Sequence, residues 1–362
     1  MQRYPLFSSA DEPYDPEPRP EMTSPNQFAT EMATVAQTVM RHKEQIRLVA
    51  PERWRTVSQL ECLASSLPHV LRTEFGIDMA SMAWIKMYEL LQSIHFPSSS
   101  SRVRTMHLCE APGAFVSSLI HYINRLRWIG EIPGDFVHEW FASSLRADKA
   151  LQRLHGNSFL DDTANHWIYG KDGTGDLLNP SVIQDIWVQV GSQTCDLVTG
   201  DGGVDFDSHP EQQETMALAL IHAQVVAALG CLKIGGTLVL KIFSCFHAET
   251  AVLLALLNSL FVTSHLTKPV ASKPCNSEVY FVGEGFTGIA AATLKSLLHR
   301  TAGLGSHWNQ NFAEKLFIAE CNLAQNQSFH LATALEHAFL PVRLPSCTHE
   351  QRAWAEQFLH HR

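Results

Sequence analysis

The segment MHLCEAPGAF, residues 106–115, constrains the fold of this chain more than any other segment. Its apolar run ends in Glu110 and breaks at once into Pro-Gly before a helical pattern begins, as a buried strand does when it turns into a helix. We expect a strand over residues 106–109 and a helix over residues 115–125. Open α/β sheets bind ligands at the carboxyl ends of such strands. The segment therefore predicts a Rossmann-like α/β sheet with helices on both faces and a ligand site beside Glu110.

The turn after this strand limits the choice of ligand. It contains neither the GxGxxG pattern of dinucleotide-binding turns nor the GxxxxGK[ST] pattern of phosphate loops, which argues against both ligand classes. A carboxylate at this position suits a cationic amine better than a pyrophosphate. S-adenosyl-L-methionine carries such an amine beside its sulfonium, and we predict that it contacts Glu110, Ala111, Pro112, Gly113, Ala114 and Phe115. The alternative for this segment alone is an ordinary strand-to-helix turn.

A second segment, CDLVTGDGG at residues 195–203, has the same form, because a buried strand ends in Asp201 and two glycines. Two parallel strands that end in carboxylates at one sheet edge form one site. We therefore expect Asp201 to lie near Glu110 and to contact the cofactor. The alternative is that Asp201 is only a turn acid.

Two further segments place charges at strand ends. GGTLVLKIF, residues 235–243, follows a helical run over residues 211–229 and carries Lys241 in a nearly continuous apolar strand, where charge is expensive unless it is used or paired. In KPVASKPCNSEVYFVG, residues 268–283, Glu278 stands at the start of a strand, as it would in a late antiparallel strand. The alternatives are a lysine that reaches the surface and an edge-strand charge that discourages sheet pairing.

Taken in order, the motifs APGAF, DLVTGDGG, LVLKIF and SKxxNSEVYFV resemble those of the FtsJ-type ribose 2′-O-methyltransferases, over residues 79–283. The motifs LCEAPGAF and NSEVY together are most similar to those of the eukaryotic mRNA cap methyltransferases of the cap 2 type, which modify the second transcribed nucleotide. Members of the family share a Lys-Asp-Lys-Glu tetrad. By motif, the resemblance places three of its members on Asp201, Lys241 and Glu278, and AWIKMYELL around Lys86 matches the first.

The resemblance implies a chemistry that needs these residue types. A ribose hydroxyl is a weak nucleophile at neutral pH, so the protein must orient it and help to remove its proton, and no metal is required. We expect Lys241 to be the base or the group that orients the hydroxyl, with Lys86 as a second positive charge nearby. Asp201 and Glu278 are expected to hold the two ammonium groups. For Lys86 alone, a solvated helix lysine is the alternative.

The middle of the chain holds one more cofactor candidate. Residues 165–180, NHWIYGKDGTGDLLNP, resemble segments near the adenosine in cap methyltransferases, and Asp176 is predicted to hold the adenine amino group. A plain surface loop is the alternative. Upstream, residues 136–145 are the predicted second strand, whose end meets the cofactor ribose in such folds, although no acid stands at that end.

Length and composition fit one elaborated catalytic domain as well as two small ones, since 362 residues with 45% hydrophobic content can bury a full core. We divide the chain into a proline-rich acidic flexible tail (1–27), a helical extension along the RNA groove (28–78), the methyltransferase core (79–283) and a C-terminal helical extension (284–362). Helical periodicity is expected over residues 28–48, 57–75, 288–298, 312–325 and 351–361. The last part is shorter than in animal cap 2 enzymes, which favours a short member or a catalytic fragment.

Charge and aromatic content bear on RNA as a partner. The formal charge of −9 argues against nonspecific wrapping of nucleic acid, so capped mRNA is expected to bind through a local basic patch. The candidates for this patch are Arg41, His42, Lys43, Arg47, Arg53, Arg55, Arg102 and Arg104. The candidates for stacking on the cap or on a base are Trp54, Trp84 and Tyr88. Solvated helix faces are the alternative for the arginines.

Other patterns exclude several classes of site. The eight cysteines form no CxxC pair and read as reduced core thiols of an intracellular protein, and no Cys or His grouping has zinc-site spacing. The longest apolar run, residues 251–262, is too short to span a bilayer. We therefore expect a monomer of the nucleus or cytoplasm with no metal and no membrane partner. A cap 1 or structured-RNA ribose methylase is the nearest alternative function, and a catalytically silent RNA-binding module is the alternative from another class.

Overall fold

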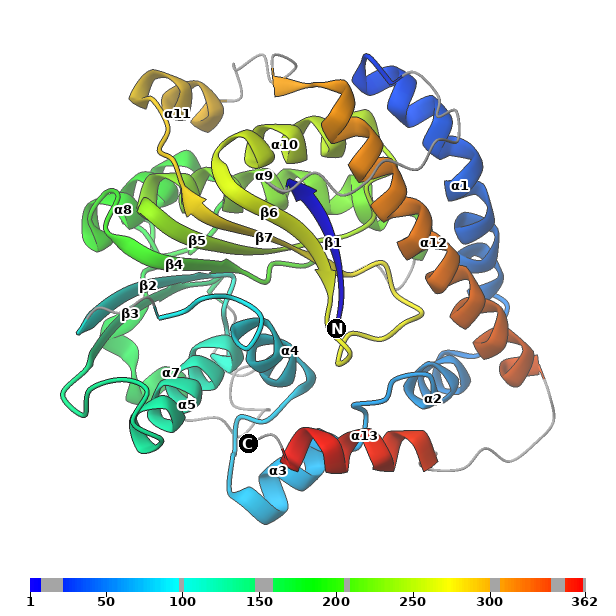
Figure 1. Ribbon diagram of the computed structural model, residues 1–362, viewed down its shortest axis with the longest axis horizontal. Helices are drawn as coiled ribbons and strands as arrows, with labels where there is room; N and C mark the ends of the chain where they lie inside the picture. The colour runs from blue at the N-terminus through cyan, green and yellow to red at the C-terminus, as the bar shows by residue number, and fades with distance from the viewer. Residues whose placement is uncertain are drawn as a thin grey trace.

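Seven strands build one mixed sheet in the computed structural model, which describes residues 1–7, 22–97, 101–146, 159–204, 209–299, 307–339 and 349–360. The strands are β1 (Gln2–Phe7), β2 (Arg102–Leu108), β3 (Val137–Ser143), β4 (Cys195–Gly200), β5 (Leu232–Ile242), β6 (Phe261–Lys268) and β7 (Val279–Phe286). Their order across the sheet is β1-β6-β7-β5-β4-β2-β3 (Figure 1). β2, β3, β4 and β5 run parallel, whereas β7 runs antiparallel to β5 and β6. This arrangement confirms the predicted Rossmann-like sheet with a late antiparallel strand.

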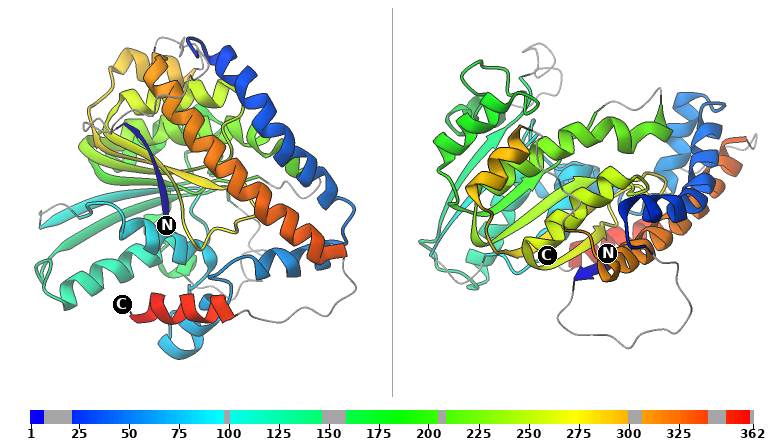
Figure 2. Two further views of the ribbon diagram at one scale, coloured as in Figure 1. Left: turned by 45° about the vertical axis from the view of Figure 1, so that its right-hand side comes forward. Right: turned by 90° about the horizontal axis from the view of Figure 1, so that it is seen from above.

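Helices cover both faces of the sheet. They are α1 (Pro25–Ile46), α2 (Pro51–Leu60), α3 (Leu67–Phe75), α4 (Met82–Leu91), α5 (Ala114–Trp128), α7 (Phe159–Asp162), α8 (Pro180–Val190), α9 (Gln213–Cys231), α10 (Ala248–Ser259), α11 (Ala291–Leu298), α12 (Gln310–Phe339) and α13 (His349–His360). α8, α9 and α10 lie over one face, and α4 and α5 lie over the other (Figure 1). The long helices α1 and α12 pack side by side along the flank of the molecule (Figure 2).

Strand alternation explains why the central strands are apolar throughout. Leu197 and Val198 are neighbours in β4 and both are fully buried, yet they pack into different hydrophobic clusters. Val239 and Leu240 in β5 divide in the same way. Successive side chains point to opposite faces of a sheet, so a strand covered on both faces needs a continuous apolar run. One cluster includes α9 and α10, and the other includes α4 and α5.

The antiparallel strand β7 brings distant segments to one edge of the sheet. Lys241 of β5 pairs with Tyr280, and Ile242 pairs with Val279. Because the two strands run in opposite directions, the start of β7 meets the end of β5. Glu278, the residue before β7, is thereby placed at the edge where the parallel strands end.

The predicted helices are present with shifted ends. α1 begins three residues before the predicted start at residue 28, and residues 312–325 lie inside the 30-residue helix α12. The predicted helix over residues 57–75 is instead two helices, α2 and α3. Pro68 explains the break, because a proline is tolerated in the first turn of α3 but would interrupt a continuous helix.

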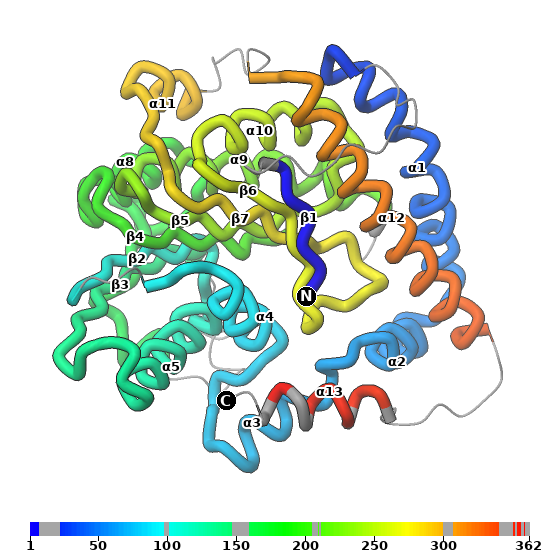
Figure 3. Tube along the Cα trace, viewed as in Figure 1, coloured from blue at the N-terminus to red at the C-terminus, as the bar shows by residue number. Residues whose placement is uncertain are grey.

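The prediction of a flexible tail over residues 1–27 is wrong at both of its ends. Residues 2–7 form β1, which pairs antiparallel with β6, and the trace in Figure 3 shows it lying along that strand. Leu6 and Met22 are buried in the main hydrophobic cluster, and α1 already begins at Pro25. The prediction missed β1 because prolines and acidic residues dominate the composition of residues 1–27, and a strand of only six residues changes that composition little. Residues 8–21 lie outside the described part of the chain.

The most apolar helix is a core helix. α9 is long and apolar enough to cross a membrane, but 67% of its most apolar 18-residue window is buried inside the protein, where it packs on β2, β4 and β5. The apolar run at residues 251–262 is divided between α10 and β6. All seven cysteines in the described residues are free thiols, and Cys347 lies outside them.

Candidate active site

The predicted tetrad comes from four separate segments. Lys86 lies on α4, Asp201 follows β4, Lys241 is the penultimate residue of β5, and Glu278 precedes β7. Parallel strands end at one edge of a sheet, and β7 starts at that edge, so all four side chains meet there. The structure thus brings together the four residues that the motifs place in one site.

Lys86 and Glu278 form the first ion pair, with Nζ 2.6 Å from Oε1. Only 12% of the Lys86 side chain is exposed, so the alternative of a solvated helix lysine is wrong. Burial lowers the pKa of Lys86, but the attraction of Glu278 and Asp201 outweighs burial and raises the pKa above its usual value. Burial also raises the pKa of Glu278, while Lys86 and Lys241 bring this pKa well below its usual range. Both groups are therefore charged at neutral pH.

Lys241 and Asp201 form the second pair. Lys241 Nζ lies 3.2 Å from Asp201 Oδ1 and donates a hydrogen bond of 2.7 Å to the backbone oxygen of the same residue. The Lys241 side chain is 12% exposed, so it does not reach the surface as the alternative supposed. Asp201 acts electrostatically on Lys86, and Lys241 acts on Glu278, so the two pairs belong to one site.

Two residues outside the predicted set hold the carboxylates. The Tyr280 hydroxyl donates to Asp201 Oδ1 at 2.9 Å, and the Ser272 hydroxyl donates to Glu278 Oε1 at 2.9 Å. Tyr280 is fully buried, and burial with the nearby Asp201 raises its pKa well above the usual value. Tyr280 stands two residues after Glu278, and residues two apart in a strand share a face. That spacing was the available signal for its role.

Glu110 lies at the predicted turn but faces the helix that follows. Its Oε1 accepts hydrogen bonds from the backbone N–H groups of Phe115 at 2.8 Å and Val116 at 3.0 Å, so it satisfies two amides in the first turn of α5. Burial, with a contribution from Asp201, raises the pKa of Glu110 to about 8. Gly113 has a φ of +112°, and a Cβ there would lie 2.4 Å from Phe159 Cδ1. The turn 111–113 is therefore packed directly under α7.

Three predicted cofactor residues converge at the end of β2. Burial raises the pKa of the Cys109 thiol to about 12, and Asp201, Glu110 and Asp176 all contribute to the increase. The Asp201 N–H donates to the backbone oxygen of Leu108 at the end of β2, and Asp176 follows Gly175, which packs on Ser144 after the neighbouring strand β3. The three acids therefore lie at the ends of adjacent strands. Asp201 and Asp176 are acidic groups that suit a ligand with positive charge, whereas Glu110, whose pKa is raised to about 8, is mostly protonated at neutral pH. The residues present therefore fit S-adenosyl-L-methionine.

The glycine-rich segment that holds Asp176 is a packed loop. A Cβ on Gly175, whose φ is +67°, would lie 1.9 Å from the backbone oxygen of Ser144, just after β3. Asp176 Oδ1 accepts a hydrogen bond of 2.9 Å from the backbone N–H of Leu178. The loop is thus held against the end of β3 at Gly175, while residues 171–173 form the turn that the surface-loop alternative describes, and the role of Asp176 stays a prediction.

The predicted basic patch does not form one surface. Lys43 is buried, Arg47 pairs with Glu211, and Arg53 donates to the backbone oxygens of His337 and Ala338. Arg102 and Arg104 both pair with Glu139 at the amino end of β2, which is the end opposite the site. Most of these cations therefore have structural partners. Among the candidates, only Arg41 and Arg55 are exposed and have no assigned partner within the described residues.

Two of the three stacking candidates belong to the core. Trp84 and Tyr88 are almost completely buried and stack on each other, with ring centroids 5.3 Å apart and planes 9° apart. Their rings are thus unavailable to a base, and Trp54 is partly buried against the main cluster. Within the parts of the chain that the structure describes, no group of three or more His, Cys, Asp or Glu side chains is placed to hold a metal ion.

Comparisons with known proteins show the family of this chain. A family described as FtsJ-like methyltransferase matches residues 79–286. The Drosophila melanogaster protein named cap-specific mRNA (nucleoside-2'-O-)-methyltransferase 2 is 33% identical over 216 residues, which cover 59% of this chain and 31% of that protein. The Mus musculus protein of the same name is 32% identical over 242 residues, which cover 64% of this chain and 30% of that protein. The chain spans about a third of the length of these relatives. Because the family match covers more than half of its residues, the chain belongs to the FtsJ-like methyltransferases.

Proposed function

We propose that this chain transfers a methyl group from S-adenosyl-L-methionine to a ribose 2′-hydroxyl near the 5′ end of capped mRNA, on the second transcribed nucleotide. The observation that carries the proposal is the pair of buried lysine–carboxylate contacts, Lys86 with Glu278 and Lys241 with Asp201, at one sheet edge. The relatives named for cap-specific 2′-O-methylation support the substrate class, and the choice of the second nucleotide rests on the resemblance of the motifs to the cap 2 type.

The cofactor is held at the ends of β2 and β4 in this proposal. Asp176 and Asp201 face it with negative charge, Glu110 holds the first turn of α5, and the turn 111–115 approaches the cofactor with backbone. When bound, S-adenosyl-L-methionine supplies a methyl group on a positively charged sulfur. The protein contributes binding and orientation, which convert a reaction of two molecules into one within a single complex.

Lys241 orients the ribose hydroxyl. Its ammonium group has three donors, and two of its nearest acceptors are the side-chain and backbone oxygens of Asp201. A remaining donor would orient the hydroxyl oxygen and stabilise the negative charge that grows on it as the hydroxyl proton passes to water. The Lys86–Glu278 pair adds positive charge and a fixed carboxylate beside this position. Fixed charges of this kind favour the transition state because they need no rearrangement during the reaction.

A panel of short RNAs tests this function. The wild-type protein is incubated with methyl-labelled cofactor and with four RNAs: uncapped, capped, capped with the first ribose methylated, and capped with the second ribose lacking its 2′-hydroxyl. We expect label on the second ribose of both capped RNAs that retain that hydroxyl, and none on the other two.

Each other result selects a different function. Label on the first ribose identifies a cap 1 enzyme, and label on the uncapped RNA identifies a methylase that does not need the cap, as expected for a structured-RNA enzyme. RNA binding with no transfer to any substrate, while the cofactor binds normally, identifies a catalytically silent module. All three results contradict the proposal.

A further inference from the structure

We propose that Gln327 and Lys43, on helices outside the family-matched residues, are positioning residues that hold the segment before Glu278 and so set the place of that carboxylate. The inference rests on the proposed function for its effect on turnover. Its structural basis is a buried polar network around residues 275–278, built by α12 and α1.

Gln327 of α12 clamps this segment through its side-chain amide. Gln327 Nε2 donates to the backbone oxygen of Cys275 and to Ser277 Oγ, both at 3.1 Å. Gln327 and Ser277 are both buried. A buried amide that meets backbone and side-chain groups of one short segment restricts that segment, because a broken bond would leave a polar group unsatisfied.

Lys43 of α1 reaches the same hydroxyl from a different direction. Its Nζ donates to Ser277 Oγ at 2.7 Å and to Gln213 Oε1 of α9 at 3.1 Å. Only 2% of Lys43 is exposed, so its ammonium group interacts with groups inside the protein and is not accessible to RNA. A buried ammonium is expensive unless it is hydrogen-bonded, so the contact with Ser277 is strongly preferred. Two helices, α1 and α12, thus meet at Ser277, the residue next to Glu278, and Gln213 of α9 holds the same Lys43 ammonium group.

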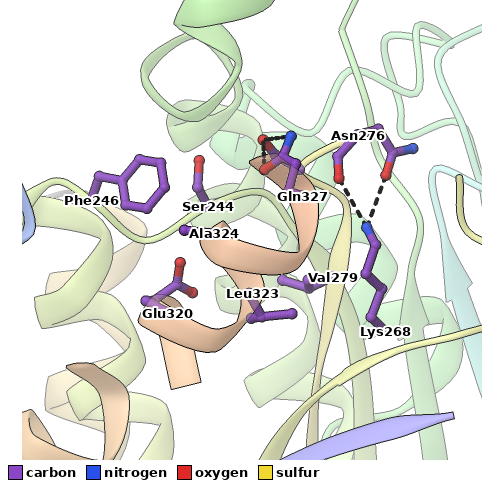
Figure 4. Close-up of a pocket in the computed structure, with 10 residues that line it drawn as sticks. Ser244, Phe246, Lys268, Asn276, Val279, Glu320, Leu323, Ala324 and Gln327 are labelled. Atoms are coloured by element: carbon purple, nitrogen blue, oxygen red, sulfur yellow. Dashed lines mark hydrogen bonds between the residues drawn. The ribbon is translucent and has the colours of Figure 1, made fainter. Parts of the chain in front are cut away.

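Lys268 of β6 holds the other side of the segment. Its Nζ donates to the backbone oxygens of Asn276 at 2.9 Å and Glu278 at 2.8 Å, and Figure 4 shows it beside Asn276 with Gln327 across the segment. The cavity between them has a volume of about 10 Å³, which is room for about one water molecule. The network is therefore filled by side chains and leaves no space for a ligand. Its role is to fix the backbone that carries Glu278.

The geometry connects these contacts to the tetrad. Glu278 directly follows Ser277, and its Oε1 lies 2.6 Å from Lys86 Nζ. A shift of the segment by a fraction of a bond length would lengthen this contact, and small misplacements of catalytic groups reduce turnover strongly. α1 and α12 both lie outside residues 79–286, so this chain uses its added helices to position a group of the shared site.

Gln327→Ala tests the inference, with Gln325→Ala as the matched control. Gln325 is an exposed glutamine on the same helix, two residues away. We expect Gln327→Ala to lower kcat by about tenfold to hundredfold while KM for RNA and the Kd for cofactor stay unchanged. In the same protein, hydrogen exchange of residues 272–278 should become faster. Gln325→Ala should change neither quantity. If Gln327→Ala does not fold, Ser277→Ala removes the same contact from the other side.

The outcomes separate this inference from the proposed function. An active wild type with equal kcat in Gln327→Ala overturns the positioning role, as does unchanged hydrogen exchange in the segment. A parallel rise in KM and in the cofactor Kd also overturns it, because that pattern indicates general disorder of the site. A wild type that methylates none of the RNAs counts against the proposed function, and hydrogen exchange then still decides whether Gln327 holds the segment.

Discussion

Lys86 and Lys241 are both nearly buried, and each meets a carboxylate from another segment of the chain. A buried charge without a partner costs several kcal/mol, so each lysine depends on its own acid. Glu110 shows the contrasting case, because its nearest donors are neutral backbone amides and burial raises its pKa. Glu110 and Glu278 are both buried glutamates, yet their pKa values shift in opposite directions because only Glu278 has lysines beside it.

At the residue scale, Lys241→Ala should abolish detectable methyl transfer, with a loss of at least about 100-fold in kcat. The reason is that the hydroxyl loses the donor that orients it, while the acids proposed to face the cofactor remain. The cofactor Kd, measured by calorimetry, should therefore stay within about twofold of the wild-type value.

Lys295→Ala is the control for this variant, since Lys295 is an exposed lysine on α11, remote from the sheet edge. It should match the wild type in both measurements. A Lys241→Ala protein that retains wild-type turnover would remove Lys241 from the mechanism.

At the element scale, a chain of buried side-chain hydrogen bonds joins β2 to its neighbours β3 and β4. His107 has no exposed surface, and its ring nitrogens lie 2.9 Å from Thr105 Oγ1 and 2.8 Å from Thr199 Oγ1. His138 of β3 reaches the same Thr105 hydroxyl at 3.0 Å. Burial, with a contribution from His138, lowers the pKa of His107 to about 3. Burial, together with nearby Arg127, lowers the pKa of His138 to about 4. The folded protein therefore keeps both rings neutral.

These pKa shifts predict that acid destabilises the fold. The unfolded chain binds a proton on each histidine below about pH 6.5, whereas the folded chain resists protonation until about pH 4 for His138. Their stabilising contribution is thus complete above pH 6.5 and is lost as the pH falls through this window. In His138→Gln, the free energy of unfolding should fall less steeply as the pH falls from 6.5 to 4, because the slope of about 1.4 kcal/mol per pH unit that His138 contributes is removed.

Urea unfolding of wild type and variant between pH 7 and pH 4 measures this difference. The advantage of the wild type over His138→Gln should shrink as the pH falls below 6.5. His107, whose pKa of about 3 also depends on His138, stays neutral in the folded protein above pH 4 and does not add to the difference. His95→Gln is the control, because the His95 side chain is 99% exposed. A constant difference between wild type and His138→Gln across the range would contradict a neutral His138.

At the scale of the whole molecule, segments from both ends of the sequence complete the α/β core. β1 extends the sheet beyond β6, and α12 packs against α1, α2 and β1. Leu6 of β1 is buried in the same cluster as the central strands. The first residues are therefore part of the cooperative structure.

Leu6→Ala should lower the free energy of unfolding by about 2–5 kcal/mol, because it leaves a cavity in the main core. Gln2→Ala on the same strand is the control, and as an exposed position it should change stability by about 0.5 kcal/mol or less. Thermal and urea unfolding measure both effects. Equal stability of Leu6→Ala and the wild type would mean that β1 is detached in solution.

Most of the sheet could be predicted because its signals are local. The strand around residue 106 and the strand around residue 197 each show an apolar run followed by an acid and a glycine turn, and both strands are present. The positions of Asp201 and Lys241 at the sheet edge follow from the same signals. The division of residues 57–75 into two helices was missed, although Pro68 marked it.

The sequence by itself determined the α/β core, because apolar strand runs and turns are patterns of neighbouring residues, and its motifs indicated the four charged residues of the candidate site through the resemblance to a known family. Only the tertiary structure decided which charges are buried pairs, that Lys43 and Gln327 meet at Ser277, and that residues 2–7 form a strand. These features join residues about 40 to 270 positions apart, and such contacts arise from packing of the whole chain rather than from local preference.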